Sequence, residues 1–254
     1  IVERDGAVRC VVTTNAAAAN HEVRLELKPQ FGNGKPGRLS RTLAGGWLPI
    51  PVISLAQEGV VYRQCNFVAP CDEPGSDPYR LNRRSVCVVE FTVTNTQPSP
   101  AEASLSLAFA DRRTGKAQVK LTPDSRGWLV SSERGFLALA ATTTATPLTV
   151  TAGESVLNLS GTLPASGTAQ FALFVPAQAD TAVGSLQASH LRAATEGYWN
   201  AALAPAMQVA TPDPLLNEVI RSSQVRCLID ARNEADGARV AAWIAAISYG
   251  PLES

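Results

Sequence analysis

Five cysteines and two histidines are the side chains of this sequence with the widest range of chemistry. An odd number of cysteines cannot all pair within one chain, and their spacings match no common zinc motif. We therefore expect reduced thiols. Cys65 and Cys71 flank residues 66–70 and could form a disulfide in an exported protein, whereas the others lie in apolar runs and are expected to be small core side chains. These are Cys10, Cys87 and Cys227.

His21 and His190 are the two imidazoles that a catalytic triad or a two-histidine metal site would have to use. His21 begins a strand-like run, and His190 lies on or beside the apolar face of a helical run, so both are better explained as structural. A nucleophile pair of either histidine with Cys65 or Cys71 can be written down. Nothing in the sequence brings the two groups within hydrogen-bond reach.

Asp72, Glu73 and Asp77 form a cluster of carboxylates that invites a calcium or acid–base interpretation. Their spacing does not match the regular calcium-binding loop, and the prolines and glycine among them indicate an ordinary turn-rich loop. The Gly-rich segment at residues 32–37 has neither the phosphate-loop spacing nor a following helix. We expect no metal, no nucleotide and no other cofactor.

Aromatic side chains are the candidates for substrate binding. Trp47, Tyr62 and Tyr79 could form a stacking platform for sugar rings, as aromatics with a polar tip do at ligand surfaces. Core packing is the alternative for each of them. It is the preferred role for Trp128, which has Leu129 and Val130 as neighbours.

Composition excludes several partners. The 254 residues carry 22 basic and 22 acidic side chains, so no net field favours nucleic acid or an anionic membrane. No apolar run is long enough to span a bilayer, and the first residues lack the layout of a secretion signal. The lack of that layout and the odd cysteine count favour the cytoplasm, although the location is otherwise undetermined.

Short alternating segments dominate the first 181 residues. Cys87, Val89, Phe91 and Val93 point one way, and the pattern resumes at 103–109, which predicts an antiparallel hairpin. Residues 156–159 and 169–175 predict a second one. Ten or more short strands separated by turn signals predict a mainly β fold, a large antiparallel β-sandwich (supersandwich) over residues 1–181.

The composition changes to a helical pattern after this region. Residues 182–203 predict a bridging helix and 204–212 a linker, so we place a bridging segment at 182–210. Asp213-Pro214 predicts a helix start. The two apolar stripes that follow predict buried helical faces and a short α-helical tail over 211–254: Leu216, Val219, Ile220, Ser223, Cys227 and Leu228, then Val240, Trp243, Ile244 and Ile247. Two such helices need partners, so we expect a fragment of a longer protein.

The layout resembles a known superfamily. Tyr198-Trp199, the run Thr-Pro-Asp-Pro-Leu-Leu-Asn-Glu at 211–218 and Gln224 follow a sandwich-sized β region, and residues 243–254 resemble a first inner helix. This order is similar to the N-terminal part of six-hairpin, or (α/α)6-barrel, glycosidases. The resemblance implies a β-supersandwich, a barrel of helices with a sugar cleft at its mouth, and inverting hydrolysis by two carboxyl groups.

The resemblance does not supply a catalytic pair. Two helices cannot close the barrel or hold both carboxylates, so this chain is expected to lack the full active site. Glu253 lies where a barrel loop could face the cleft and is the one catalytic candidate, against the simpler interpretation of a solvated side chain.

Three functions therefore compete. The first is the N-terminal portion of a glycoside hydrolase that acts on a carbohydrate substrate. The second is a non-catalytic carbohydrate-binding or dimerisation module, and the third is an adventitious hydrolase of small activated esters. The exposed stripes of the C-terminal helices could fold back on the sandwich or pair with the same tail of a second chain. We favour the second, which predicts a homodimer through those helices.

Overall fold

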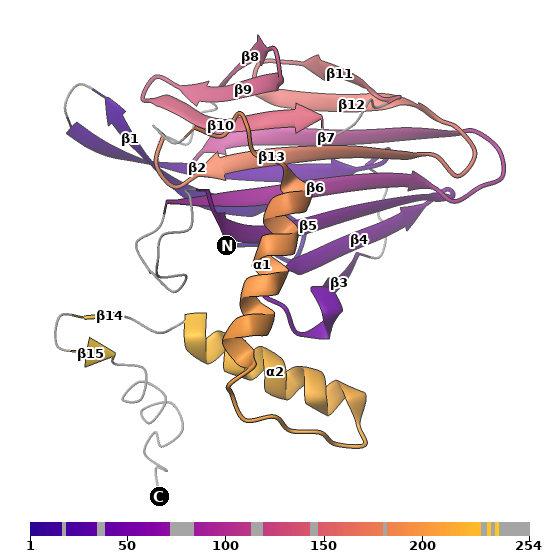
Figure 1. Cartoon of the computed structure of the whole chain (residues 1–254). Coiled ribbons are helices and arrows are strands. Elements are labelled where there is room, and N and C mark those ends of the chain that lie inside the picture. Colours follow the sequence, from indigo (N-terminus) through magenta and orange to yellow (C-terminus); the bar gives the residue numbers. More distant parts are fainter. Residues whose placement is uncertain are drawn as a thin grey trace, which may run out of the picture.

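The structure is a computed structural model that describes residues 1–16, 19–34, 39–71, 84–112, 119–142, 147–179 and 182–229, with a short strand pair, β14 (Asn233–Glu234) and β15 (Gly237–Ala238). Two antiparallel sheets stack face to face, and two helices follow them (Figure 1). This confirms the predicted mainly β fold with a sandwich and short helices.

The two sheets differ in size. The five-stranded sheet has the order β1 (Val8–Ala16), β2 (Ala19–Phe31), β7 (Ala101–Asp111), β12 (Val156–Leu163) and β11 (Thr149–Ala152). The eight-stranded sheet has the order β3 (Ser40–Leu43), β4 (Pro51–Gln57), β5 (Val60–Pro70), β6 (Ser85–Asn95), β13 (Thr168–Pro176), β10 (Gly135–Thr142), β9 (Gly127–Ser132) and β8 (Lys120–Asp124).

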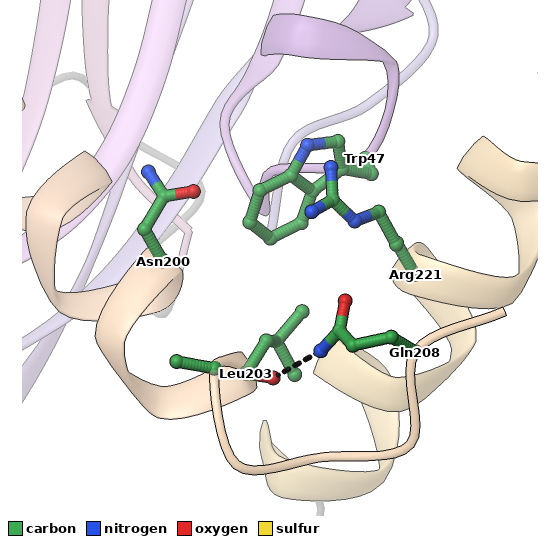
Figure 2. A pocket seen from close by; sticks show the side chains of 6 residues that line it. Trp47, Asn200, Leu203, Gln208 and Arg221 are labelled. Carbon is green, nitrogen blue, oxygen red and sulfur yellow. Dashed lines mark hydrogen bonds between the residues drawn. The ribbon is translucent and has the colours of Figure 1, made fainter. Parts of the chain in front are cut away.

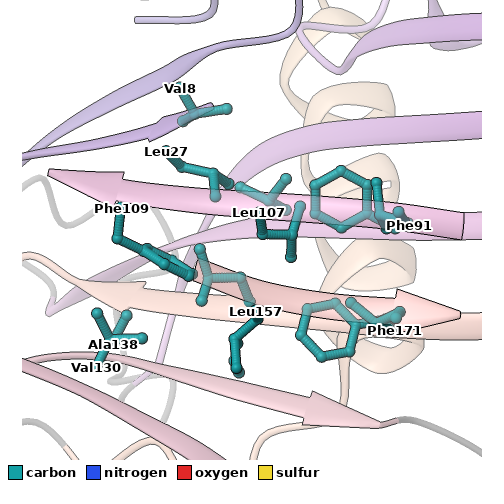
Figure 3. Close-up of a cluster of buried hydrophobic side chains, with 14 of the residues drawn as sticks. Val8, Leu27, Phe91, Leu107, Phe109, Val130, Ala138, Leu157 and Phe171 are labelled. Carbon is teal, nitrogen blue, oxygen red and sulfur yellow. The ribbon is translucent and has the colours of Figure 1, made fainter. Parts of the chain in front are cut away.

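The main core lies between the sheets, and its side chains come from both of them (Figure 3). Phe91 on β6 is 1% exposed and Thr92 is half-buried, which confirms the predicted inward face of this strand. Phe91 packs on Phe171 of the neighbouring strand β13, with ring centroids 6.3 Å apart. Phe109 and Leu157 contribute from the five-stranded sheet.

Both predicted hairpins are wrong in the same way. β6 pairs with β5 and β13, while β7 pairs with β2 and β12, so consecutive strands lie in opposite sheets. The connection from β12 to β13 also crosses between the sheets. Alternation shows only that a strand has one buried face. A strand that pairs beside its predecessor and a strand that packs across the core from it both show this pattern.

Asn95 fastens the two crossing connections to one another. Its side chain is fully buried, and its Nδ2 donates to the carbonyl oxygens of Ser99 (2.8 Å), Leu163 (3.2 Å) and Pro164 (2.9 Å). The backbone N–H of Asn95 donates to Gly167 O at 2.9 Å. One amide therefore satisfies buried carbonyls from both connections, which would otherwise be left without partners.

Helix α1 (Ala188–Leu203) covers the outer face of the eight-stranded sheet (Figure 1). The helix predicted for 182–203 thus begins at Ala188. A second cluster of buried side chains fills the space beneath it, including Phe67, Val88 and Phe174 from the sheet and Leu203 from the helix. The eight-stranded sheet is therefore covered on both faces.

Helix α2 (Pro214–Ile229) follows the linker. Asp213 Oδ1 accepts from Leu215 N at 2.9 Å and Leu216 N at 3.4 Å, which confirms the predicted N-cap. The predicted stripe is exposed, with Leu216 and Val219 45% and 50% exposed, and Val225 is the buried residue of this helix. The partner that this stripe is expected to need stays a prediction. The second stripe, at 240–247, lies outside the described residues.

In the described part of the chain, no helix combines the length and the apolar character needed to cross a membrane.

Candidate functional site

Trp47 lies in a tight loop between β3 and β4. The one-turn 3-10 helix η1 (Ala44–Gly46) precedes it, and Ala44 N donates to Ile50 O at 3.0 Å while Leu48 N donates to Ala44 O at 3.1 Å. Gly45 and Gly46 have φ angles of 57° and 79°, in the left-handed region that favours glycine. This loop turns the Trp47 indole toward the helices.

Helix α2 meets the loop on the side opposite to its exposed apolar stripe. The Arg221 guanidinium carbon lies 4.9 Å from the centroid of the Trp47 ring, which is a cation–π arrangement. A Cβ at Gly46 would come within 2.1 Å of the Glu218 carboxyl carbon, so the missing side chain lets the helix approach. Polar side chains of α2 therefore hold it against the sandwich.

A cavity of about 210 Å³ lies at this junction (Figure 2). It draws on three parts of the chain: the η1 loop, the end of α1 with the linker after it, and α2. Pockets for drug-sized ligands begin near 300 Å³, so this cavity suits a smaller group. Its lining residues are Trp47, Asn200, Leu203, Ala204, Gln208 and Arg221.

The two amides of the pocket direct their oxygens into it. Asn200 Nδ2 donates to Glu196 O at 2.9 Å, and Gln208 Nε2 donates to Leu203 O at 2.8 Å and Ala206 O at 3.0 Å. Because the NH₂ groups are engaged by the backbone, the carbonyl oxygens face toward Trp47 and Arg221 (Figure 2). The pocket thus offers two acceptors, one cationic donor and an aromatic surface.

The linker that bounds the pocket is held by residues of the 211–218 run and by Gln224. Thr211 N donates to Asn217 Oδ1 at 2.8 Å, and Asn217 Nδ2 donates back to Thr211 O at 3.0 Å. Gln224 Nε2 donates to Met207 O at 2.8 Å. These motif residues position the pocket wall rather than line it.

Tyr62, the second predicted substrate-binding residue, lies in the core between the sheets. Its ring is 3% exposed and packs 6.0 Å from the ring of Phe31, measured between centroids. Its hydroxyl oxygen accepts from Ser104 N at 3.3 Å, and burial raises the pKa of that hydroxyl. The structure therefore places Tyr62 in a packing role, away from Trp47.

Tyr79 and Glu253, the remaining predicted site residues, lie outside the described residues, as do Asp72, Glu73 and Asp77. Trp128 packs half-buried against the inner core. Stacking of a sugar on Trp47 stays a prediction. The structure adds that the Arg221 guanidinium already lies over this ring.

The bridge that Cys65 and Cys71 could form in an exported protein does not fit the structure. Residues 60–70 form the extended strand β5, which contains Cys65 and ends next to Cys71. Six residues of strand span roughly 20 Å, whereas the Cα atoms of a disulfide lie about 4–7 Å apart. Cys65 is buried beneath α1, where burial raises its pKa, and Cys71 Sγ donates to Arg84 O at 3.4 Å.

The histidines do not join a nucleophile in the described residues. His190 is exposed on α1, not on its apolar face, and the side chain of His21 lies outside the described part. The described residues also contain no group of three or more His, Cys, Asp or Glu side chains that could hold a metal ion.

An ion pair joins α1 to the eight-stranded sheet near Cys65. Arg192 Nη1 lies 3.1 Å from Glu90 Oε2, and the Glu90 side chain is 16% exposed. Burial raises the pKa of the Glu90 carboxyl, and the nearby Arg192 offsets part of this effect. This pair holds the helix and lies outside the pocket lining.

Sequence reasoning identified Trp47 but missed the other polar groups of the pocket. Asn200, Gln208 and Arg221 come from three separate segments, and no spacing in the sequence relates them. One weak sequence signal marked Arg221 as a candidate for the pocket: it lies outside the apolar stripe predicted for its helix.

Comparison with known proteins gives little. The sequence matches no protein-family model and has no significant match among curated proteins. Among solved structures, it is similar to a protein from the human microbiome provisionally described as a kojibiose phosphorylase, with 9% identity and a TM-score of 0.33. The match covers 89% of this chain and 32% of that one, so this chain spans about a third of its length. A TM-score this low carries no argument about function.

Proposed function

We propose that this chain is the sandwich and connecting region of a carbohydrate-active enzyme, a glycoside hydrolase of the six-hairpin type, and that the Trp47 pocket binds one neutral sugar unit. The observation that carries the proposal is the lining of the pocket. An aromatic ring, two amide oxygens and a guanidinium converge on a cavity of about 210 Å³. Hydroxyl groups of a sugar can donate to the amide oxygens and accept from Arg221.

The position of the pocket also supports this function. It lies where the sandwich, α1 and α2 meet, and the η1 loop of the sandwich contributes Trp47 to it. The resemblance implies that a loop of the sandwich helps to wall a sugar cleft. The lining contains no carboxylate, so the proposal gives the pocket a binding role. Inverting hydrolysis needs an acid and a base on opposite sides of the scissile bond, and no residue of the pocket is assigned to either.

Saturation-transfer NMR of the full chain with maltose and with cellobiose tests the proposal. We expect saturation of sugar protons by the wild-type chain and its loss in Trp47→Ala and Arg221→Ala, because each removes one side of the pocket. Tyr198→Ala is the matched control, since Tyr198 is 39% exposed on the same helix as Asn200 but does not line the pocket.

Two outcomes would contradict the proposal. One is the absence of saturation transfer to either sugar. The other is equal transfer in the wild type and Arg221→Ala, a variant that removes the cationic side of the pocket. Loss of binding in Tyr198→Ala as well would indicate non-specific stacking.

A homodimer through the C-terminal helices stays a prediction. The exposed Leu216 and Val219 provide an apolar surface for it on α2. The ester-hydrolase alternative gains no support from His190, which is exposed on α1.

A further inference from the structure

Two cysteines that the sequence suggests are separate core thiols meet in the fold. Cys10 lies on β1 in the five-stranded sheet, and Cys87 lies on β6 in the eight-stranded sheet. Both are half-buried and both pack against the same inner core. The two thiols are close enough that each shifts the pKa of the other.

Backbone hydrogen bonds join both strands to the segment that follows β13. Thr13 N donates to Ala177 O at 2.8 Å, and Ala179 N donates to Thr13 O at 2.9 Å, so β1 joins the segment that follows β13. Ala177 N in turn donates to Ser85 O at 2.9 Å, at the start of β6. Cys10 and Cys87 therefore lie close to the place where the edge of one sheet meets the other.

The side chains of both cysteines point into the sandwich. Cys10 is opposite Leu25 in the register of β1 and β2, and Leu25 is a core residue. Cys87 is on the same face of β6 as Val89 and Phe91, which are also core residues. The two thiols thus approach each other from opposite sheets.

The interaction shifts the two thiols in opposite directions. The Cys87 thiol lowers the pKa of the Cys10 thiol, and the Cys10 thiol together with burial raises the pKa of Cys87. A thiolate, not a thiol, attacks a disulfide. Each residue keeps part of its surface exposed.

We propose that Cys10 and Cys87 are a redox-active pair that closes into a disulfide between the two sheets, with a small-molecule disulfide such as oxidised glutathione as the oxidant. The Cys10 thiolate attacks one sulfur of glutathione disulfide, the S–S bond breaks, and one glutathione leaves as a thiolate and takes up a proton. Cys87 then attacks the Cys10 sulfur of the mixed disulfide and releases the second glutathione. The protein loses two electrons and two protons, and two glutathione thiols gain them.

The bond would tie edge strand β1 to the centre of the other sheet. It would join residues far apart in the sequence, so it would restrict the unfolded chain across the whole segment from Cys10 to Cys87. We expect the oxidised protein to melt roughly 5–15 °C above the reduced protein. Reduction should restore the lower Tm.

Peptide mapping of the full chain identifies the bond directly, because trypsin separates the relevant cysteines. Cys10 lies in the fragment 10–24, Cys87 in 85–112, Cys65 and Cys71 together in 64–80, and Cys227 in 227–232. After oxidation with glutathione disulfide and alkylation of the remaining thiols, we expect one linked species, 10–24 with 85–112. It should disappear when the sample is reduced before alkylation.

Serine variants test the pair and its effect on stability. Cys10→Ser and Cys87→Ser should each lose the linked species and the Tm increase on oxidation. Cys71→Ser and Cys227→Ser, which change thiols of similar exposure, should keep both. The proposal is overturned if Cys10 and Cys87 of the oxidised wild type are recovered separately, as alkylated thiols or as glutathione adducts. It is also overturned if Cys10→Ser melts higher on oxidation by the same amount as the wild type.

Discussion

The two outer faces of the sandwich are built from different side chains. The outer face of the five-stranded sheet carries small polar residues such as Ser106, Asn158 and Ser160, and it has no helix over it among the described residues. The outer face of the eight-stranded sheet carries Phe67, Val88 and Phe174, all buried beneath α1. A third layer therefore covers one sheet only.

The difference can be traced to patterning along the strands. β7 alternates between buried and half-buried residues throughout its length, whereas the end of β13 is buried at every position from Phe171 to Pro176. A continuous apolar run indicates a strand that is covered on both faces, and alternation indicates a strand with one face in water. The run in β13 was thus a signal for the position of α1.

The largest expected effect distinguishes the two faces by stability. Phe174→Ala should destabilise the protein by about 3–5 kcal/mol, as deletion of a core phenylalanine does, because Phe174 is 2% exposed under α1. Ser160→Ala, on the outer face of the other sheet, should change the free energy of unfolding by less than about 0.5 kcal/mol. Urea unfolding of the two variants measures both values.

Phe91→Ala provides the inner-face reference for this comparison. It should cost about 3–5 kcal/mol, and Thr92→Ala well under about 1 kcal/mol. If Phe174→Ala costs no more than Ser160→Ala, α1 does not bury the sheet in solution, and the two outer faces are equivalent.

An intermediate effect on stability is expected at the connections between the two sheets. Asn95→Ala should destabilise the protein by about 1–3 kcal/mol, because it leaves buried carbonyl oxygens of both connections without a donor. Thr96→Ala is the matched control, since this neighbour donates one exposed hydrogen bond, to Gly59 O. Chemical denaturation is again the measurement, and equal costs would show that the two connections are not joined by Asn95.

The smallest effect is a difference in how two carboxyl groups, one on each outer face, make the stability depend on pH. The hydrogen bond from Arg9 lowers the pKa of Glu26 on the five-stranded sheet, whereas burial raises the pKa of Glu90 on the eight-stranded sheet. Glu26 thus stabilises the fold above its ordinary pKa, and this contribution is lost as pH falls through its lowered folded pKa. For Glu90 the stabilisation belongs to the protonated form, and it is lost as pH rises through its raised folded pKa.

Glu26→Gln and Glu90→Gln should therefore change the pH profile of unfolding in opposite directions. Between about pH 3.5 and pH 7, the advantage of the wild type over Glu26→Gln should grow with pH. Its advantage over Glu90→Gln should shrink over the same range. Parallel profiles for the two variants would contradict the proposed difference in environment.

Much of the fold was predictable from the sequence. The strands, the inward face of β6 at Phe91 and the helix start at Asp213 each follow from local spacing and from local hydrogen-bonding chemistry. The predicted hairpins failed, because the partner of a strand depends on where the chain crosses the core. The stripe on α2 is exposed, because Arg221 and Val225 dock the opposite side of the helix.

The candidate site was also only partly predictable from the sequence. The sequence singled out Trp47, but the approach of Asn200, Gln208 and Arg221 to it depends on how α1, the linker and α2 meet the η1 loop. It also suggested a pair between Cys65 and Cys71, whose short separation in sequence becomes roughly 20 Å along an extended strand. Cys10 and Cys87, far apart in sequence, are brought together by the stacking of the sheets.

The sequence by itself determined the mainly β class, the position of most strands, the inward face of β6 and the start of α2 after Asp213. These properties arise from periodicity and from contacts a few residues apart, which any stretch of chain carries with it. Only the tertiary structure decided which strands pair, which face of α2 docks, which side chains surround Trp47 and which thiols meet. Those properties depend on contacts between distant segments. Because burial of apolar surface is non-directional, the sequence pattern alone is compatible with several arrangements.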